Sequence, residues 1–284
     1  NTADIMIVGH YLGDTSLAAI GASTVIFELL VGFTLGFGNG LSIVVARNFG
    51  SGNKEAIKKS VALSLILGLA ITIIITLGSR FFLYPLLKAL RTPEAILQES
   101  YVYISTITLF IVVMFGYNLC ASLLRAIGNS FAPLIFLVIS SILNISLDIF
   151  FIVNMKMGIN GAAIATAIAQ GVSVVLCLFY IKNKAKILIP NKTHFKSDRA
   201  LYKELISQGL SMALMSSIVS LGSVILQSSI NNLGYLTIAG HSAARKLFGL
   251  SIIPFFALGT ALSTFVSQNR GAEKGERIIK GVKY

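Results

Sequence analysis

Apolar residues gather in long continuous runs along the chain, separated by short polar segments. Strands of membrane barrels alternate between apolar and polar residues over about ten positions, whereas most of these runs are unbroken and about twice as long. About 20 apolar residues suffice for a helix to cross a bilayer, and only helices and closed barrels satisfy their backbone groups in lipid. The pattern predicts an all-α polytopic membrane protein, with apolar runs at 1–13, 17–46, 61–79, 100–124, 126–155, 157–181, 205–230 and 236–269.

Composition and the placement of charge agree with this class. A mean hydropathy of +0.83, with 12% charged residues among 284, excludes a soluble domain. The net charge of +12 would suit a nucleic-acid partner, but 17 of the 23 Lys and Arg residues lie in alternate loops, at 47–59, 182–203 and 270–284 and at Arg125. Basic loops face the cytoplasm, so topology explains the charge and no nucleic-acid partner is expected. We expect a multi-pass protein of the inner (plasma) membrane, surrounded by the lipid bilayer.

One polar stripe inside an apolar run is the first candidate for chemistry. Ser140, Asn144 and Asp148 lie four residues apart and therefore share a helix face. A carboxylate near mid-span costs about 2.5–3.5 kcal/mol on insertion scales, so it faces protein or a water-filled cavity. Simple helix adhesion is the alternative, but amide and hydroxyl groups achieve adhesion without that cost. The stripe indicates a site for a cation or a proton.

Three glycines four residues apart mark one face of the run at 17–46. Gly32, Gly36 and Gly40 form a doubled pattern of small residues. In membranes such a pattern lets two backbones approach closely. We expect another helix to pack on this face.

Two stretches of the chain repeat each other. Residues 12–59 match residues 233–280 without a gap at an offset of 221, with 15 identities in 48 positions. Both copies lead through a long helix into a basic loop, so they share an orientation. Parallel repeats of about six helices are a transporter architecture with the site between the halves. We expect two pseudo-symmetric six-helix bundles, the second incomplete: an amino-terminal lobe at 1–182 with a truncated first helix, a cytoplasmic linker at 183–204, and the start of a carboxy-terminal lobe, helices seven and eight, at 205–284.

Several motifs, in their order along the chain, suggest a family. They are Asp4–Gly13 with Leu17-Ala-Ala-Ile-Gly21, Leu124-Arg-Ala-Ile-Gly128, Asn144–Asp148 with Gly158–Thr166, and Val266-Ser-Gln-Asn-Arg-Gly-Ala272. With these motifs and the repeat, the chain resembles the multidrug and toxic compound extrusion (MATE) transporters. The resemblance runs over the whole chain, which corresponds to roughly helices one to eight of twelve.

The resemblance implies a cation site in the amino-terminal lobe. In that family the site is built by an acid on helix one, an Asn and an Asp one turn apart on helix five, and a Thr on helix six. The matching residues here are Asp4, Asn144, Asp148 and Thr166. Oxygens of these types suit a hard cation such as sodium, and a proton is the alternative coupling ion. No other metal and no cofactor are expected.

Further polar residues in the apolar runs are candidates for lining a cavity. Tyr103 falls where the family has a site-lining tyrosine, although tyrosines at a helix entry are also typical of an interface belt. Glu28 is another acid at membrane depth, with an interfacial position as its alternative. Gln170 lies one turn beyond the candidate threonine, and Ser140 belongs to the polar stripe. Some branches of the family carry a glutamate midway along helix seven for a site in the carboxy-terminal lobe. This chain has Val219 at that position, so the resemblance does not extend to that site.

The residues and the resemblance together predict a cation-coupled antiporter and not an enzyme. Two carboxylates in a low-dielectric cavity repel each other, and a proton, a sodium ion or a cationic substrate can relieve that repulsion. We expect a monomer that exports amphipathic organic cations by alternating access, driven by protons or sodium. The alternative is a lipid-linked oligosaccharide or polysaccharide flippase, which would need basic groups for a pyrophosphate; Arg245 and Lys246 are the candidates.

The topology can be tested with single cysteines, because both native cysteines fall inside apolar runs. A membrane-impermeant maleimide added to intact cells should not label Lys192→Cys, which lies in a predicted cytoplasmic loop. The same reagent should label Lys156→Cys, which lies in an opposite loop. Labelling of Lys192→Cys from outside would overturn the orientation.

Overall fold

The computed structural model describes residues 2–90, 92–196, 198–231 and 235–283, with all their side chains except those of 2–3 and of part of 223–250. Residues 232–234 and the side chains of Arg245 and Lys246 lie outside the described part. Every described element is a helix: α1 (Thr2–Leu12), α2 (Asp14–Gly50), α3 (Lys54–Ala89), α4 (Glu94–Leu109), α5 (Ile111–Ala126), α6 (Phe131–Ile149), η1 (Phe150–Asn154), α7 (Ile159–Lys184), η2 (Lys186–Leu188), η3 (Lys192–Phe195), α8 (Arg199–Asn231), α9 (Tyr235–Gly271) and α10 (Gly275–Lys283).

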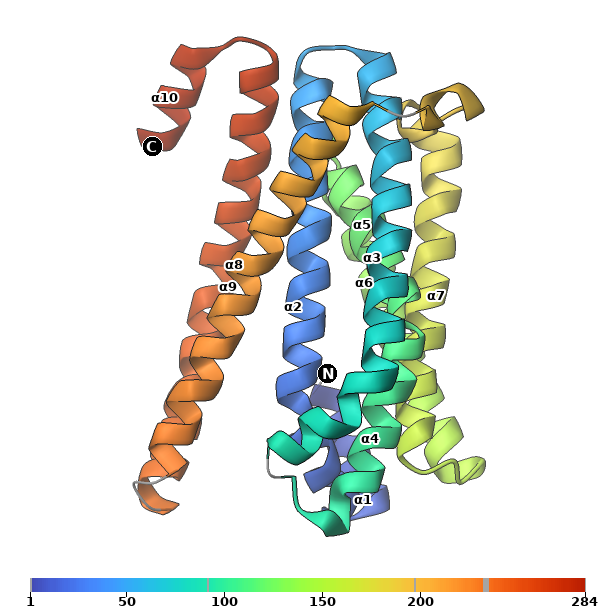
Figure 1. Ribbon diagram of the computed structural model, residues 1–284, viewed down its shortest axis with the longest axis vertical. Coiled ribbons are helices and arrows are strands. Elements are labelled where there is room, and N and C mark those ends of the chain that lie inside the picture. Colours follow the sequence, from blue (N-terminus) through green and yellow to red (C-terminus); the bar gives the residue numbers. More distant parts are fainter. Residues whose placement is uncertain (1, 91, 197, 232–234, 284) are drawn as a thin grey trace.

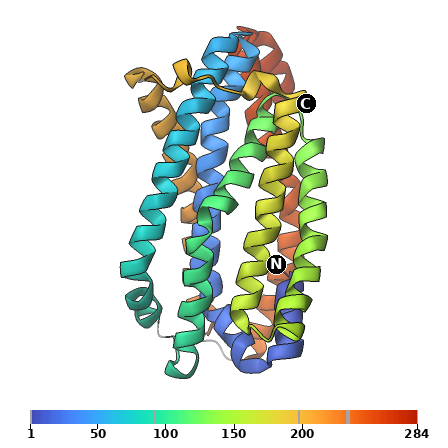
Figure 2. The same ribbon diagram turned by 90° about the vertical axis from the view of Figure 1, so that its right-hand side faces the viewer.

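The long helices confirm the predicted class. Among the described residues, six helical stretches are long and apolar enough to cross a bilayer, and the bent pair α4 and α5 would make a seventh. The helices stand roughly side by side along the long axis of the molecule (Figure 1 and Figure 2). The protein is therefore an all-α, multi-pass membrane protein.

The run at 100–124 was expected to be a single span, but it is broken at Phe110. Helices α4 and α5 meet there at a bend of 49°. The carbonyl oxygen of Thr108 accepts a hydrogen bond of 3.0 Å from the hydroxyl of Thr76 on α3, so a neighbouring helix binds the backbone next to the break. Hydroxyl groups that bond helix carbonyls are known to bend helices.

Two helices extend beyond the apolar runs that predicted them. Helix α3 continues past the run at 61–79, through Pro85 to Ala89. Helix α8 begins at Arg199, ahead of the run at 205–230.

The three basic segments, 49–59, 182–203 and 270–284, lie at the same end of the molecule (Figure 1). An ion pair and a hydrogen bond fix the linker there: Lys59 Nζ lies 2.7 Å from Asp198 Oδ2, and His194 Nε2 lies 2.7 Å from Glu55 Oε2. The hydrogen bond from Lys59 holds the pKa of Asp198 below its ordinary value. His194 Nδ1 accepts the backbone N–H of Asn191, so Nε2 carries the proton that is donated to Glu55.

The glycine face of α2 confirms the predicted close contact, and its partner is α8. A Cβ on Gly36 would lie 2.8 Å from Cα of Ala213, and a Cβ on Gly40 would lie 2.7 Å from Cα of Gly209. Real Cβ atoms do not approach other atoms so closely. Only glycine therefore allows α8 to lie on α2 at this separation.

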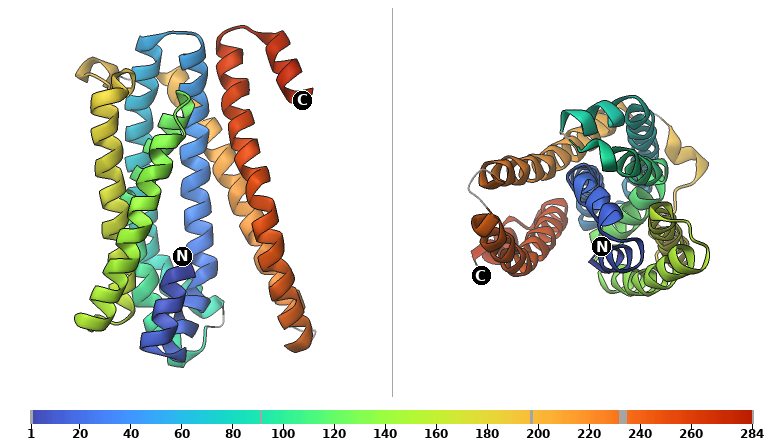
Figure 3. Two further views of the ribbon diagram at one scale, coloured as in Figure 1. Left: turned by 180° about the vertical axis from the view of Figure 1, so that it is seen from behind. Right: turned by 90° about the horizontal axis from the view of Figure 1, so that it is seen from below.

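Helices α8 and α9 form a pair beside the rest of the bundle. At the end that carries the basic segments, α9 lies against α2, and towards the other end the pair diverges from α2 (Figure 1 and Figure 3). The arrangement is V-shaped, with the closed end of the V on the basic side.

The glycine contact gives a prediction about stability. Gly36→Ala should lower the free energy of unfolding by about 1–3 kcal/mol, because overpacking forces α8 away from α2. The matched control is Gly78→Ala on α3, where an added Cβ would meet no atom within 4 Å. Thermal unfolding of the purified variants in detergent measures both. Equal melting temperatures for the two variants would contradict the packing argument.

Candidate functional site

Three helices bring two acids and a threonine together inside the bundle. Asp4 lies on α1 and is 4% exposed, while Asp148 lies near the end of α6 and is 0% exposed. The two carboxyl groups lie near enough to interact electrostatically. Thr166, on α7, completes the group, although 162 residues separate it from Asp4.

Two hydrogen bonds link three of the four residues of the predicted cation site. Asn144 Nδ2 donates to Thr166 Oγ1 at 3.4 Å, and Thr166 Oγ1 donates to Asp4 Oδ2 at 3.4 Å. Both distances lie beyond the usual range for such bonds. The polar groups are therefore held near one another by long, weak hydrogen bonds.

Small residues at the start of α7 explain the close approach of the helices. A Cβ on Gly161 would lie 3.1 Å from Cβ of Phe151. Three alanines that follow it are at most 1% exposed: Ala162, Ala163 and Ala165. The same residues that allow α7 to pack closely thus place Thr166 beside the acids.

The acid pair keeps unused hydrogen-bonding capacity. Asp4 Oδ1 and both carboxylate oxygens of Asp148 are buried without a hydrogen-bond partner. Burying a polar group without a partner costs free energy, and burying an unpaired charge costs far more. No group of three or more described His, Cys, Asp or Glu side chains could hold a metal ion. Two carboxylates, an amide and a hydroxyl suit a proton or a hard monovalent cation.

A cavity of about 190 Å³ opens beside this group. Its lining combines acids, a hydroxyl and a phenol with apolar side chains. Asp4, Thr166, Tyr103 and Glu28 all contribute to it. Tyr103, on α4, is 8% exposed, so it belongs to the cavity wall and not to an interface belt. Glu28, on α2, is exposed at the edge of the cavity.

Ser140 and Gln170 do not line this cavity. The hydroxyl of Ser140 donates to the carbonyl oxygen of Ala169 at 2.8 Å and fastens α6 to α7. Gln170 follows on α7 and is half-buried outside the lining. That these two side chains line a cavity stays a prediction, and their places on the helices lie one or two turns from Thr166 and Asp148.

Sequence reasoning missed a further acid, Glu99. It lies one turn before Tyr103 on α4, and its Oε1 accepts from Ser16 Oγ at 3.3 Å while Oε2 is buried without a partner. The spacing of four residues from Tyr103 could have signalled it. Its neighbour Ser16 is 83 positions away in the chain, and this contact is visible only in the fold.

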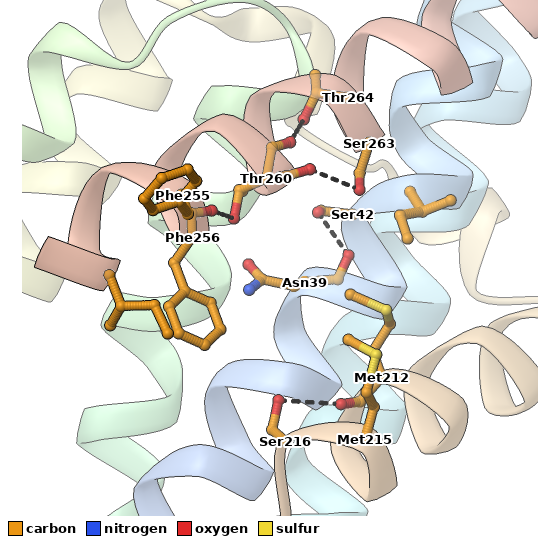
Figure 4. Close-up of a pocket in the computed structure, with 13 residues that line it drawn as sticks. Asn39, Ser42, Met212, Met215, Ser216, Phe255, Phe256, Thr260, Ser263 and Thr264 are labelled. Atoms are coloured by element: carbon orange, nitrogen blue, oxygen red, sulfur yellow. Dashed lines mark hydrogen bonds between the residues drawn. The ribbon is translucent and has the colours of Figure 1, made fainter. Parts of the chain in front are cut away.

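A second cavity, of about 390 Å³, lies between α2 and the α8–α9 pair (Figure 4). Figure 4 shows Asn39 and Ser42 of α2 facing Thr260 and Ser263 of α9. The hydroxyls of Thr260 and Ser263 donate to carbonyl groups of their own helix. The rest of the wall is apolar, aromatic or thioether, and it includes Met212, Met215, Phe255 and Phe256. The lining contains no charged side chain.

Comparison with known proteins gives the family. The MatE family model matches residues 1–150 and 211–282. The chain belongs to the MatE family. This is the multidrug and toxic compound extrusion family that the motifs resemble.

Relatives of this MatE protein span more than the chain does. The probable multidrug resistance protein YoeA of Bacillus subtilis (strain 168) is 28% identical over 281 residues, which are 96% of this chain and 61% of YoeA. A crystal structure of MATE in the bent conformation matches with a TM-score of 0.91 at 24% identity, over 98% of this chain and 62% of that one. An outward-facing conformation of a multidrug resistance MATE family transporter of the MOP superfamily matches with a TM-score of 0.90 at 25% identity, over 99% of this chain and 62% of that one. The chain thus spans about three fifths of the length of these proteins.

Proposed function

We propose that this protein works as a cation-coupled antiporter that exports amphipathic organic cations by alternating access. The observation that carries the proposal is the buried pair Asp4 and Asp148, whose carboxyl groups adjoin while three of their four oxygens lack a hydrogen-bond partner. Such a pair is costly in an apolar bundle and is retained for a purpose other than adhesion. Binding a proton or a cation is the chemistry that satisfies it.

The pair explains how two solutes can exclude each other. Two ionised carboxylates in a low-dielectric site repel each other, and one proton or one sodium ion removes most of that repulsion. A cationic substrate that reaches the adjoining cavity, at Asp4 or Glu28, would do the same. Because either cation weakens the attraction of the site for the other, entry of the coupling ion favours release of the substrate. The two carboxylates, the amide and the hydroxyl suit a proton and a sodium ion alike.

The cavities support an amphipathic cargo. The cavity between the lobes offers aromatic and thioether walls for an apolar body, and the cavity at Asp4 offers negative charge for a cationic group. Aromatic side chains also bind cations over their ring faces. The similarity to YoeA, a probable multidrug resistance protein, agrees with export of organic compounds.

The V-shaped arrangement supports alternating access. The lobes touch at the basic end and part towards the other, and a matching structure is described as an outward-facing conformation of a transporter. With the basic loops in the cytoplasm, the cavity between the lobes opens outward. Export then requires a second state in which the basic end opens.

Removing the charge of Asp148 tests the proposal. Asp148→Asn in the intact protein should abolish export of a cationic dye from cells while leaving insertion unchanged, because an amide cannot exchange protons or balance a cation. Glu94→Gln, at an exposed acid at the start of α4, is the matched control and should export normally. Dye export and the amount of protein in the membrane are measured together. Export of the dye by Asp148→Asn at the wild-type rate would contradict the proposal.

A variant of Asn144 tests whether this side chain is a ligand of the coupling ion or a packing residue. Asn144→Ala should reduce the rise in melting temperature that the coupling ion produces, because at a fixed ion concentration a ligand stabilises the folded state less when it binds more weakly. Ser140→Ala, one turn away, removes the helix contact to Ala169 instead. That variant should melt earlier by an amount that corresponds to about 0.6–2 kcal/mol, yet keep the full ion-induced rise. A full ion-induced rise in Asn144→Ala would assign this side chain to packing.

A further inference from the structure

A third cavity, of about 590 Å³, lies between the end of α5, the start of α6 and the second half of α9. It adjoins the cavity between α2 and the α8–α9 pair, because Asn39, Thr260 and Thr264 line both. Its volume falls in the range of pockets that hold small organic ligands. Unlike its neighbour it is lined by a charged side chain, that of Arg125, and its lining includes no acid.

Arg125 stands in this cavity without an ionic partner. Its side chain is half-buried, and none of the ion pairs that the described residues form involves it. Nη2 donates a hydrogen bond of 2.9 Å to Ser122 Oγ. A guanidinium group carries several N–H donors in a flat fork, so most of them are left for a ligand or for water.

A row of hydrogen bonds joins Arg125 to α2 and orients a second donor. Ser122, which is 2% exposed, accepts from Arg125 and donates from Oγ to Asn39 Oδ1 at 2.8 Å. The acceptor oxygen of the Asn39 amide is thereby occupied, and its Nδ2 group remains as a donor. The amide of Asn39 points into the adjoining cavity (Figure 4). The row thus offers N–H groups from two helices to the same space.

The start of α6 adds to the attraction for an anion. Gly128 and Ser130, which precede this helix of 19 residues, belong to the lining of the cavity. The hydroxyl of Ser130 does not cap the helix, because Asn129 Oδ1 accepts the backbone N–H of Ala132 at 3.1 Å instead. The positive end of a helix dipole favours negative charge. A guanidinium group, an amide, a hydroxyl and this dipole end therefore all favour a negatively charged ligand.

We propose that Arg125 and Asn39 bind the phosphate group of an amphipathic compound whose apolar part lies in the adjoining cavity. The planar fork of an arginine matches two oxygens of a phosphate group, and the amide of Asn39 can reach another. Met212 and Phe255 supply apolar walls next door. The site has the opposite sign to the acid pair and does not depend on the proposed export of cations. A phosphate group reaches this end of the molecule on a soluble organic phosphate or on a phospholipid.

Two pairs of probes, each differing by one phosphate group, test the proposal and its source. Adenosine monophosphate is compared with adenosine, and dihexanoyl phosphatidic acid with dihexanoylglycerol. Each probe is titrated calorimetrically into the intact protein in an uncharged detergent. The phosphate member of at least one pair should bind about ten-fold more tightly than its partner, as hydrogen bonds to a charged group require. A preference in the first pair assigns the site to soluble phosphates, and a preference in the second pair alone assigns it to lipid headgroups.

Variants connect this preference to the site. Arg125→Gln should weaken binding of the preferred phosphate probe about ten-fold, and Asn39→Ala should weaken it about three-fold. Arg125→Lys keeps the charge without the fork, so its affinity should fall between those of the wild type and Arg125→Gln. The matched control is Arg199→Gln, which removes an exposed guanidinium group at the start of α8. It should bind the probe as the wild type does.

Two results would overturn the phosphate site. One is a wild-type protein that prefers neither phosphate probe. The other is a folded Arg125→Gln variant that melts earlier yet binds the probe fully, which would mean that Arg125 only offsets the negative end of the α5 dipole. If Arg125→Gln does not fold, unchanged binding by Arg125→Lys and Asn39→Ala overturns the site equally. The titration needs neither export nor the acid pair, so Asp148→Asn should bind the probe normally, and a protein that exports no dye would refute the proposed function alone.

Discussion

Close approach of helix backbones is the constraint on which the rest of this structure depends. Lipid tails are as apolar as leucine side chains, so burial alone does not drive helices together in a bilayer, and small residues that permit close packing take its place. Gly36 and Gly40 set the position of α8 on α2, Gly161 sets the position of α7 beside the end of α6, and Gly50 with Gly271 sets the crossing of α2 and α9. Each of these contacts positions something that the proposed function uses.

The acid pair shows how packing creates chemistry. Asp148 alone would be an expensive residue in a lipid-spanning helix. The small residues of α7 allow Thr166 to reach the group, and α1 contributes Asp4 from the far end of the sequence. The result is a compact set of oxygens that is incompletely satisfied by the protein. Buried polar groups without a partner are rare in native proteins, and their presence here supports the proposed exchange of a proton or a cation.

The contact of α2 with α9 and the acid pair occupy different parts of the molecule. The acid pair lies between α1, α6 and α7, whereas the contact of Gly50 with Gly271 joins α2 and α9 at the basic end. Helix α2 connects them. Glu28, near its middle, lies at the edge of the cavity that Asp4 lines, and Gly50, at its end, contacts α9. A long rigid helix that touches both places provides a physical path between loading of the acid pair and the position of α9.

The sequence by itself determined the elements that depend on local pattern. Hydropathy placed the spans, the cost of a mid-span carboxylate singled out Asp148, and the offset of 221 residues revealed the repeat, because each of these signals is carried by neighbouring residues or by direct comparison of two stretches. The helical spacing already grouped Asn144 with Asp148, whereas Asp4 and Thr166 were assigned as their partners through the family resemblance, since nothing local says that residues 144 positions apart will meet. Only the tertiary structure decided the break at Phe110, the partner of Glu99, and the use of Ser140 in helix packing. The structure also showed that Gly50 and Gly271, which match in the repeat, lie together where α2 meets α9. These features depend on which helix lies opposite, and that choice is made by shape and close packing between distant segments, which a one-dimensional pattern does not record.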